Sequence, residues 1–236
     1  MKIGMQEGAL TRFESLLLDL PFLAQMRLAS SKSLAFLRAW HYLKRAKIEG
    51  DYLEFGVWQG RSFILALKAA RKFFDPHGRP APRFFAFDSF QGLPKPHTQQ
   101  DATAVFAEGE YRAAQDVFAR NIRGAARGWQ VITVPGFFEQ SLTPALLAQH
   151  QLRSAAFVHI DCDLYESTLQ ALRFATPILQ TGSVVLFDDW FLSGGDMRRG
   201  EAGACAQWLK EQPGLSLVDF DKVGTMGKCF IVNRAQ

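Results

Sequence analysis

The sequence predicts an α/β fold, built on a mostly parallel β-sheet with helices on both faces. Short apolar runs rich in Val, Ile and Phe alternate with longer segments of helical periodicity along most of the 236 residues. Two further strand-like runs close the sequence without room for a helix between them. Because strands joined by so short a connection pair antiparallel, the last strand should run against the others.

The expected elements follow in a simple order. Residues 1–30 are predicted to form a partly apolar helical leader, and residues 31–50 a second helix that ends at Gly50. Strands are expected at residues 51–57, 83–89, 129–135, 155–161, 183–189, 215–221 and 228–234. Helices are expected at residues 61–74, 111–124, 143–151, 167–179 and 201–212. Residues 91–109 should form either a lid over a substrate or a plain surface loop.

The composition argues against several classes of function. The net charge is only +4 and basic residues occur in short pairs, so we expect no nucleic-acid partner. The three cysteines lack CxxC spacing, which argues against zinc fingers and disulfides and favours a reducing compartment. The apolar N-terminal stretch contains Asp19 and Pro21 and is too short to span a bilayer. We therefore expect a cytoplasmic protein without a membrane partner, and homo-oligomer formation stays open.

Acidic side chains follow two successive apolar strands. Asp161 and Asp163 close the run AAFVHI, and Asp188 and Asp189 close the run VVLF. Neighbouring ends of parallel strands face one crevice, where four carboxylates would repel one another unless a cation or a ligand offset the charge. Asp161 is the better ligand for a metal. Asp163 should either cap the next helix or act as an acid or base.

The first strand ends in a glycine turn. Residues 53–62 read LEFGVWQGRS, and glycines there let a ligand approach the backbone, although a tight strand-to-helix turn alone would also explain them. Asp88 ends the second strand, where an acid binds ribose hydroxyls in dinucleotide-type folds, or else caps a turn. Glu54 would repel a pyrophosphate and attract an ammonium group. Together these residues favour S-adenosylmethionine over NAD as the ligand.

Five segments together resemble a known family. LEFGVWQGRS, FAFDSFQGLP, GFFEQSL, FVHIDCDLYESTLQAL and TGSVVLFDDW are similar, in this order, to segments of the macrocin-type (TylF-like) O-methyltransferases. The resemblance implies a Rossmann-like class I methyltransferase fold, with a seven-stranded, mostly parallel sheet and an antiparallel last strand. Residues 49–236 would be the S-adenosylmethionine-dependent methyltransferase domain. Residues 1–48 would be a helical segment that packs on or over the active site.

The resemblance also implies roles for single residues. Mg²⁺ or another divalent cation would be held by Asp161, Asp188 and Asp189. We expect Asp161 and Asp163 to be the catalytic residues, with Asp163 favoured as the general base. The residues expected to bind the cofactor are Glu54, Phe55, Gly56, Val57, Ser62, Asp88, Ser89, Phe138, Glu139 and Asp161. His159 is expected to be a buried core histidine, and His97 a surface one.

The predicted reaction is the transfer of a methyl group to a hydroxyl of a small molecule. The favoured acceptor is a sugar of a natural product, so the substrate would be a glycoside. A sugar hydroxyl is a poor nucleophile, and a divalent cation could orient two vicinal hydroxyls and lower the pKa of one. Two other enzymes stay open: a metal-dependent glycosyltransferase that uses the DxD pair Asp161 and Asp163, and a catechol-type phenol O-methyltransferase. A scaffold that keeps the fold without catalysis is a further alternative.

Overall fold

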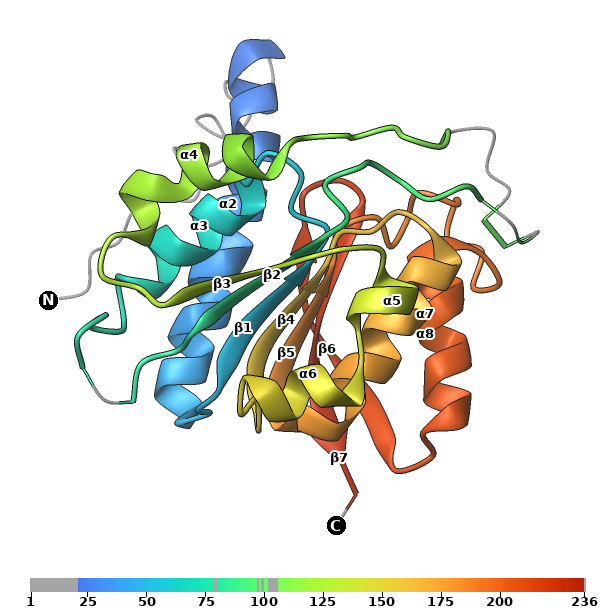
Figure 1. Ribbon diagram of the computed structural model, residues 1–236. Helices are drawn as coiled ribbons and strands as arrows, with labels where there is room; N and C mark the ends of the chain where they lie inside the picture. Colours follow the sequence, from blue (N-terminus) through green and yellow to red (C-terminus); the bar gives the residue numbers. More distant parts are fainter. Residues whose placement is uncertain (1–20, 79, 97, 99, 102–105, 236) are drawn as a thin grey trace, which may run out of the picture.

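The computed structural model of the chain describes residues 21–78, 80–96, 98, 100–101 and 106–235, and side chains from residue 31 onward. Its centre is a seven-stranded sheet with the strand order β3-β2-β1-β4-β5-β7-β6 (Figure 1). The strands are β1 (Asp51–Phe55), β2 (Phe84–Asp88), β3 (Val131–Pro135), β4 (Ala155–Ile160), β5 (Leu179–Phe187), β6 (Leu215–Val223) and β7 (Gly227–Arg234). β1 to β5 pair in parallel and β7 is antiparallel to its neighbours, which confirms the predicted sheet.

The reversed strand lies inside the sheet and not at its edge. β6 and β7 form the predicted hairpin, but β7 pairs with β5 and leaves β6 outermost. β7 buries Cys229, Phe230 and Val232, whereas β6 exposes 54% of Val218. A strand that mixes buried and exposed side chains, as β6 does, is tolerated only at the edge of a sheet. The more apolar strand β7 therefore pairs with β5.

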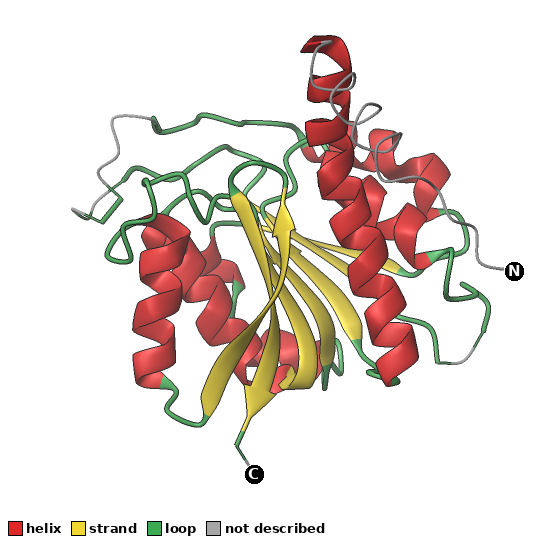
Figure 2. Cartoon of the chain, turned by 180° about the vertical axis from the view of Figure 1, so that it is seen from behind, coloured by secondary structure: helices red, strands yellow, loops and turns green. Residues whose placement is uncertain are grey.

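Helices cover both faces of the sheet (Figures 1 and 2). One face carries α2 (Pro21–Ala46), α3 (Arg61–Ala70) and α4 (Gln115–Ala126). The other carries α5 (Phe138–Ser141), α6 (Pro144–Gln149), α7 (Tyr165–Ala175), the short 3₁₀ helix η1 (Thr176–Ile178) and α8 (Gly200–Glu211). Successive strand side chains point to opposite faces, so Leu53 and Phe55 enter one core while Tyr52 enters the other.

Several element boundaries differ from the prediction. Residues 1–20 lie outside the described part of the chain, and the rest of the two expected N-terminal helices forms one helix, α2. It ends at Ala46, before Lys47 takes a left-handed φ of 57°. The segment GFFEQSL, which carried no predicted element, contains α5, and β5 begins at Leu179 instead of residue 183.

α2 shares its buried side chains with the sheet. Phe36, Trp40 and Leu43 are at most 1% exposed and belong to the same core as Tyr52 and Phe157. The division of the chain into residues 1–48 and 49–236 therefore stays a prediction. The described part of α2 packs into the same core as the sheet. No helix in the described ranges has both the length and the apolar character needed to cross a bilayer.

Candidate active site

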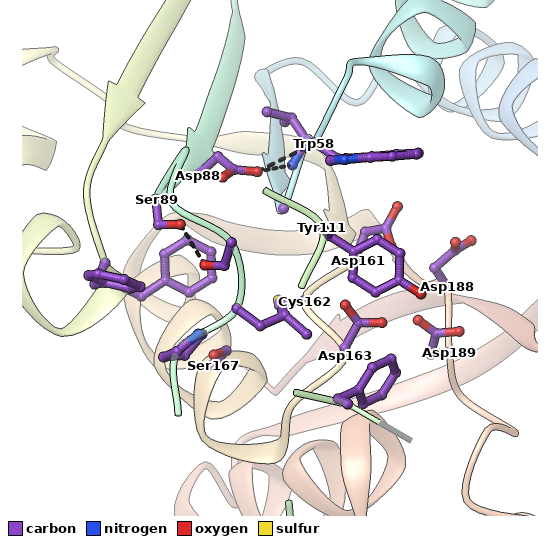
Figure 3. Close-up of a pocket in the computed structure, with 18 of the residues that line it drawn as sticks. Trp58, Asp88, Ser89, Tyr111, Asp161, Cys162, Asp163, Ser167, Asp188 and Asp189 are labelled. Atoms are coloured by element: carbon purple, nitrogen blue, oxygen red, sulfur yellow. Dashed lines mark hydrogen bonds between the residues drawn. The ribbon is translucent and has the colours of Figure 1, made fainter. Parts of the chain in front are cut away.

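The carboxyl ends of β1, β2, β4 and β5 border one cavity of about 720 Å³ (Figure 3). The sheet order predicts this place, because the connections from β1 and from β4 lead in opposite directions and leave a crevice between them. Most of the predicted site residues line the cavity: Gly56, Val57, Ser62, Asp88, Ser89, Phe138, Glu139, Asp161, Asp163, Asp188 and Asp189. Glu54 and Phe55 are fully buried and do not line it.

Asp88 holds the turn that follows β1. Its Oδ2 atom accepts hydrogen bonds from the backbone N–H groups of Val57 at 2.8 Å and Trp58 at 2.9 Å. Its Oδ1 atom accepts from the N–H group of Phe90 at 2.7 Å. Trp58 has a φ of 42°, which is costly for a bulky residue, so these bonds offset strain in the turn. Asp88 thus fixes the turn, and its role with ribose hydroxyls stays a prediction.

Gly56 brings the turn close to the acidic strand end. Its φ is 84°, and a Cβ atom there would lie 1.8 Å from the carbonyl oxygen of Asp161. The N–H group of Asp161 in turn donates to the carbonyl oxygen of Phe55 at 2.9 Å. The glycine is therefore required by the contact between two strand ends, in addition to any ligand that approaches it.

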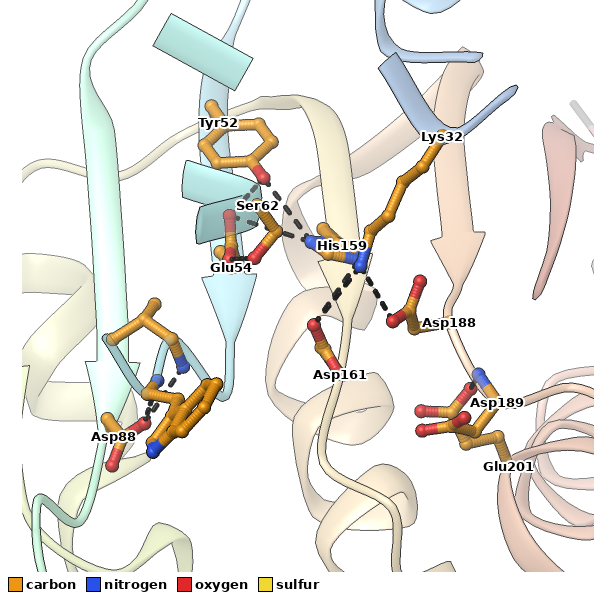
Figure 4. Close-up of polar contacts among 12 residues, drawn as sticks. Lys32, Tyr52, Glu54, Ser62, Asp88, His159, Asp161, Asp188, Asp189 and Glu201 are labelled. Atoms are coloured by element: carbon orange, nitrogen blue, oxygen red, sulfur yellow. Dashed lines mark hydrogen bonds and ion pairs between the residues drawn. The ribbon is translucent and has the colours of Figure 1, made fainter. Parts of the chain in front are cut away.

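Glu54 lies beneath the cavity in a buried polar cluster (Figure 4). Its carboxylate accepts hydrogen bonds from the hydroxyl groups of Tyr52 and Ser62, and lies 3.5 Å from His159 Nδ1. Glu54 has no exposed surface, so its carboxylate does not face the space where an ammonium group of a ligand could lie. His159 is equally buried, and its Nε2 atom lies 4.0 Å from Asp161 Oδ2 without a hydrogen-bond partner among the described residues.

Asp161, from the end of β4, meets Asp188 and Asp189, from the end of β5. One ligand atom from each of these residues lies within 4.8 Å of the others. Burial, followed by the charge of Asp188, raises the pKa of Asp161 to about 7. Burial also raises the pKa of Asp189 above its ordinary value. So many acids at one point cost free energy unless a cation lies among them.

Asp163 does not cap the helix that follows it. It has a φ of 62°, the N-cap of α7 is Leu164, and the backbone N–H group of Glu166 in the first turn donates to Asp101 Oδ1 at 3.3 Å and not to Asp163. The capping alternative is therefore wrong. Burial, followed by the charges of Asp189 and Asp161, raises the pKa of Asp163. Asp163 thus faces the acid cluster, as Figure 3 shows.

Two ionisable residues at this site were not predicted. Lys32 on α2 places its Nζ atom 2.7 Å from Asp188 Oδ2 and 3.7 Å from Asp161 Oδ2. Burial would lower the pKa of Lys32, but the charges of Asp161 and Asp188 outweigh burial and raise it. Glu201 on α8 is 1% exposed, and its Oε2 atom accepts a hydrogen bond from the backbone N–H group of Asp189 at 2.9 Å. His97 lies outside the described residues.

Relatives of known activity match part of this chain. The tetracenomycin enzyme 8-demethyl-8-(2,3-dimethoxy-alpha-L-rhamnosyl)-tetracenomycin-C 4'-O-methyltransferase of Streptomyces olivaceus is 32% identical over 151 residues, 61% of this chain and 54% of that protein. Mycinamicin III 3''-O-methyltransferase of Micromonospora griseorubida is 31% identical over 156 residues, 62% of this chain and 57% of that protein. The chain thus spans little more than half the length of these relatives.

Solved structures share the fold. The O-methyltransferase NovP superposes with a TM-score of 0.66 at 21% identity, over 87% of this chain and 80% of its own. The calicheamicin methyltransferase CalS11 gives 0.67 at 21% identity, over 98% and 94%. The Rossmann-like class I methyltransferase fold is therefore confirmed. The family model of the macrocin O-methyltransferases (TylF) matches residues 12–203, most of the sequence, and the chain accordingly belongs to that family.

Proposed function

We propose that the protein transfers a methyl group from S-adenosylmethionine to a hydroxyl of a small molecule, a sugar of a glycosylated natural product, with the help of a divalent cation. Membership of the family and the names of its sugar-methylating relatives support this class of acceptor. The observation that carries the proposal is the cluster of Asp161, Asp188 and Asp189 within 4.8 Å, in the wall of the cavity that the glycine turn also borders.

The cofactor would lie along the turn after β1. Asp88 offers carboxylate lone pairs for ribose hydroxyls beyond those that already hold the turn, and Phe138 and Glu139, which follow the neighbouring strand β3, also line the cavity. S-adenosylmethionine supplies the electrophilic methyl group when bound. The volume of about 720 Å³ lies within the usual range for small-molecule sites.

The acid cluster fits a hard divalent cation such as Mg²⁺. Asp161, Asp188 and Asp189 offer only carboxylate oxygens, which are the ligands that Mg²⁺ prefers, and a cation would offset the repulsion among them. When bound, the ion supplies a Lewis acid that lowers the pKa of a hydroxyl group. Asp163 is our candidate to accept the proton of that hydroxyl, because it lines the cavity beside the cluster. Its pKa is raised by burial and by the neighbouring acids, and a cation bound among those acids would lower it and favour the carboxylate that this role needs.

Two exposed aromatic rings border the cavity and suit the apolar face of a sugar ring. Trp58 is 41% exposed and Tyr111 is 46% exposed, and their ring centroids lie 5.9 Å apart in an edge-on arrangement. Large exposed rings beside a polar site indicate recognition of a ligand. A phenol could stack there as well, so the assay must compare both kinds of acceptor.

Tritium transfer from labelled S-adenosylmethionine tests the proposal. Methyl α-L-rhamnoside, rhamnosylated natural products and catechol would serve as acceptors, each with Mg²⁺ and with EDTA. We expect labelled product from the glycosides. EDTA should lower the rate of methyl transfer at least about a hundredfold, the scale expected when a hydroxyl loses its activation, and added Mg²⁺ should restore the rate. Transfer that is indifferent to EDTA would refute the metal, and sugar transfer from a nucleotide sugar would favour the glycosyltransferase.

The variant Asp188→Asn separates the metal from the cofactor. We expect it to lose activity as wild type does in EDTA, because one ligand has lost its charge, while the affinity for S-adenosylhomocysteine changes less than about threefold. Asp116→Asn is the matched control, since Asp116 is an exposed acid on α4 that pairs only at the surface with Arg120. It should leave both quantities unchanged.

A further inference from the structure

α2 places a permanent cation among the acids that we propose as metal ligands (Figure 4). The Nζ atom of Lys32 lies 2.7 Å from Asp188 Oδ2 and 3.7 Å from Asp161 Oδ2. The three side chains are only 23–26% exposed, so solvent screens the contact less than it screens a surface ion pair. This contact joins residues that are 156 positions apart in the sequence.

The core fixes the position of Lys32. Phe36 follows it by one helical turn and lies on the same side of α2. Phe36 has no exposed surface, and its ring lies 5.3 Å from the ring of His159 and 5.5 Å from that of Phe157. Because both of those partners belong to β4, the helix is anchored on the strand that ends in Asp161. Lys32 is thus directed at the cluster by packing and not by its charge alone.

The ammonium group and a divalent cation would use the same two carboxylates, those of Asp161 and Asp188. Mg²⁺ needs carboxylate oxygens at about 2.0–2.1 Å, and Asp188 Oδ2 and Asp161 Oδ2 are the atoms that now face Lys32. Two positive groups held by the same carboxylates would repel each other in this partly buried site. Occupation by one cation therefore opposes occupation by the other.

We propose that Lys32 is a built-in competitor of the divalent cation: its ammonium group occupies the acid cluster in the metal-free protein, and the incoming ion displaces it. This inference rests on the metal site of the proposed function. The ammonium group offsets part of the negative charge of Asp161 and Asp188 while no ion is bound. It lowers the apparent affinity for the ion because the ion can bind only while the ammonium group is out of the site. Because linkage is reciprocal, a bound ion must release the side chain of Lys32.

Binding of Mn²⁺, followed by electron paramagnetic resonance of the free ion, tests the competition. Lys32→Met keeps the length of the side chain and the helix propensity but removes the charge. We expect it to bind Mn²⁺ about tenfold more tightly than wild type, or better, because no ammonium then occupies the site. Lys44→Met is the control, since Lys44 lies on the same helix outside the cavity, over the ring of Phe74, and should leave the affinity unchanged.

An affinity of Lys32→Met that equals or falls below that of wild type would overturn the inference. If that variant does not fold, as checked by circular dichroism, Lys32→Gln replaces it. A second measurement uses wild type alone: saturating Mn²⁺ should increase the acylation of Lys32 by an N-hydroxysuccinimide ester, read by mass spectrometry, and no increase would also overturn it. If neither wild type nor Lys32→Met binds Mn²⁺ while both bind S-adenosylhomocysteine, the metal site itself falls and the inference falls with it.

Discussion

Asp88 accepts three hydrogen bonds from backbone N–H groups. Val57 and Trp58, in the turn after β1, donate to one carboxylate oxygen, and Phe90, which follows β2, donates to the other. Asparagine has a single acceptor oxygen, so Asp88→Asn must leave at least one of these donors facing an amide group. Hydrogen bonds to a charged group contribute about 1.5–3 kcal/mol each. We therefore expect the affinity for S-adenosylhomocysteine to fall by about tenfold or more.

Isothermal titration calorimetry would measure this loss. Asp75→Asn is a suitable control, because Asp75 accepts a hydrogen bond from the backbone N–H group of His77 in an exposed turn away from the cavity. An unchanged dissociation constant for Asp88→Asn would show that the turn keeps its shape without the carboxylate.

Residues of this site differ in how far local sequence reveals them. Asp161 and Asp188 follow apolar strands, and that pattern alone predicts that they meet. Lys32 gives no such signal, because its contact with Asp188 spans 156 positions and depends on how a helix packs. The contact between Glu54 and Tyr52 can be predicted from sequence. Tyr52 lies two positions earlier in β1, and side chains two positions apart in a strand lie side by side on the same face.

At the scale of the elements, α2 is part of the core. Trp40 is 1% exposed, and its ring lies 6.0 Å or less from the rings of Tyr52, Phe84 and Phe157. We expect Trp40→Ala to lower the free energy of unfolding by about 3–5 kcal/mol, the usual cost of removing a buried aromatic side chain. Urea denaturation followed by circular dichroism would measure it.

Leu34→Ala is a control on the same helix, because Leu34 is 45% exposed. This substitution should lower the free energy of unfolding by well under half as much as Trp40→Ala does. A small effect of Trp40→Ala, or a separate early transition of the helix, would mean that α2 is a detachable segment.

The order of the strands shows where prediction from sequence ends. Alternation of apolar runs and helical segments predicts parallel strands, and a short connection predicts the hairpin of β6 and β7. Neither pattern decides which arm of the hairpin pairs with β5. The physical reason lies in side chains: β7 can be covered on both faces, whereas β6 carries Asp219 and Asp221, which favour an edge.

At the scale of the whole molecule, ligand binding and folding are linked. A ligand that binds only the folded state adds about 2.7 kcal/mol of stability at one hundred times its dissociation constant. For a chain of this size that corresponds to an increase in melting temperature of roughly 5–10 °C. We expect S-adenosylhomocysteine to produce such an increase in a calorimetric scan. UDP-glucose is the control, and an increase with UDP-glucose alone would contradict the proposed cofactor.

The contact between Gly56 and Asp161 limits how this protein could be redesigned. A side chain at Gly56 would wedge β1 away from β4, because its first carbon would overlap a carbonyl oxygen at 1.8 Å. The glycine turn after β1 and the acid cluster would then move apart together with the strands that carry them. Efforts to change the acceptor should therefore begin at the rim, with Trp58 and Tyr111, whose rings can be exchanged without moving the frame behind them.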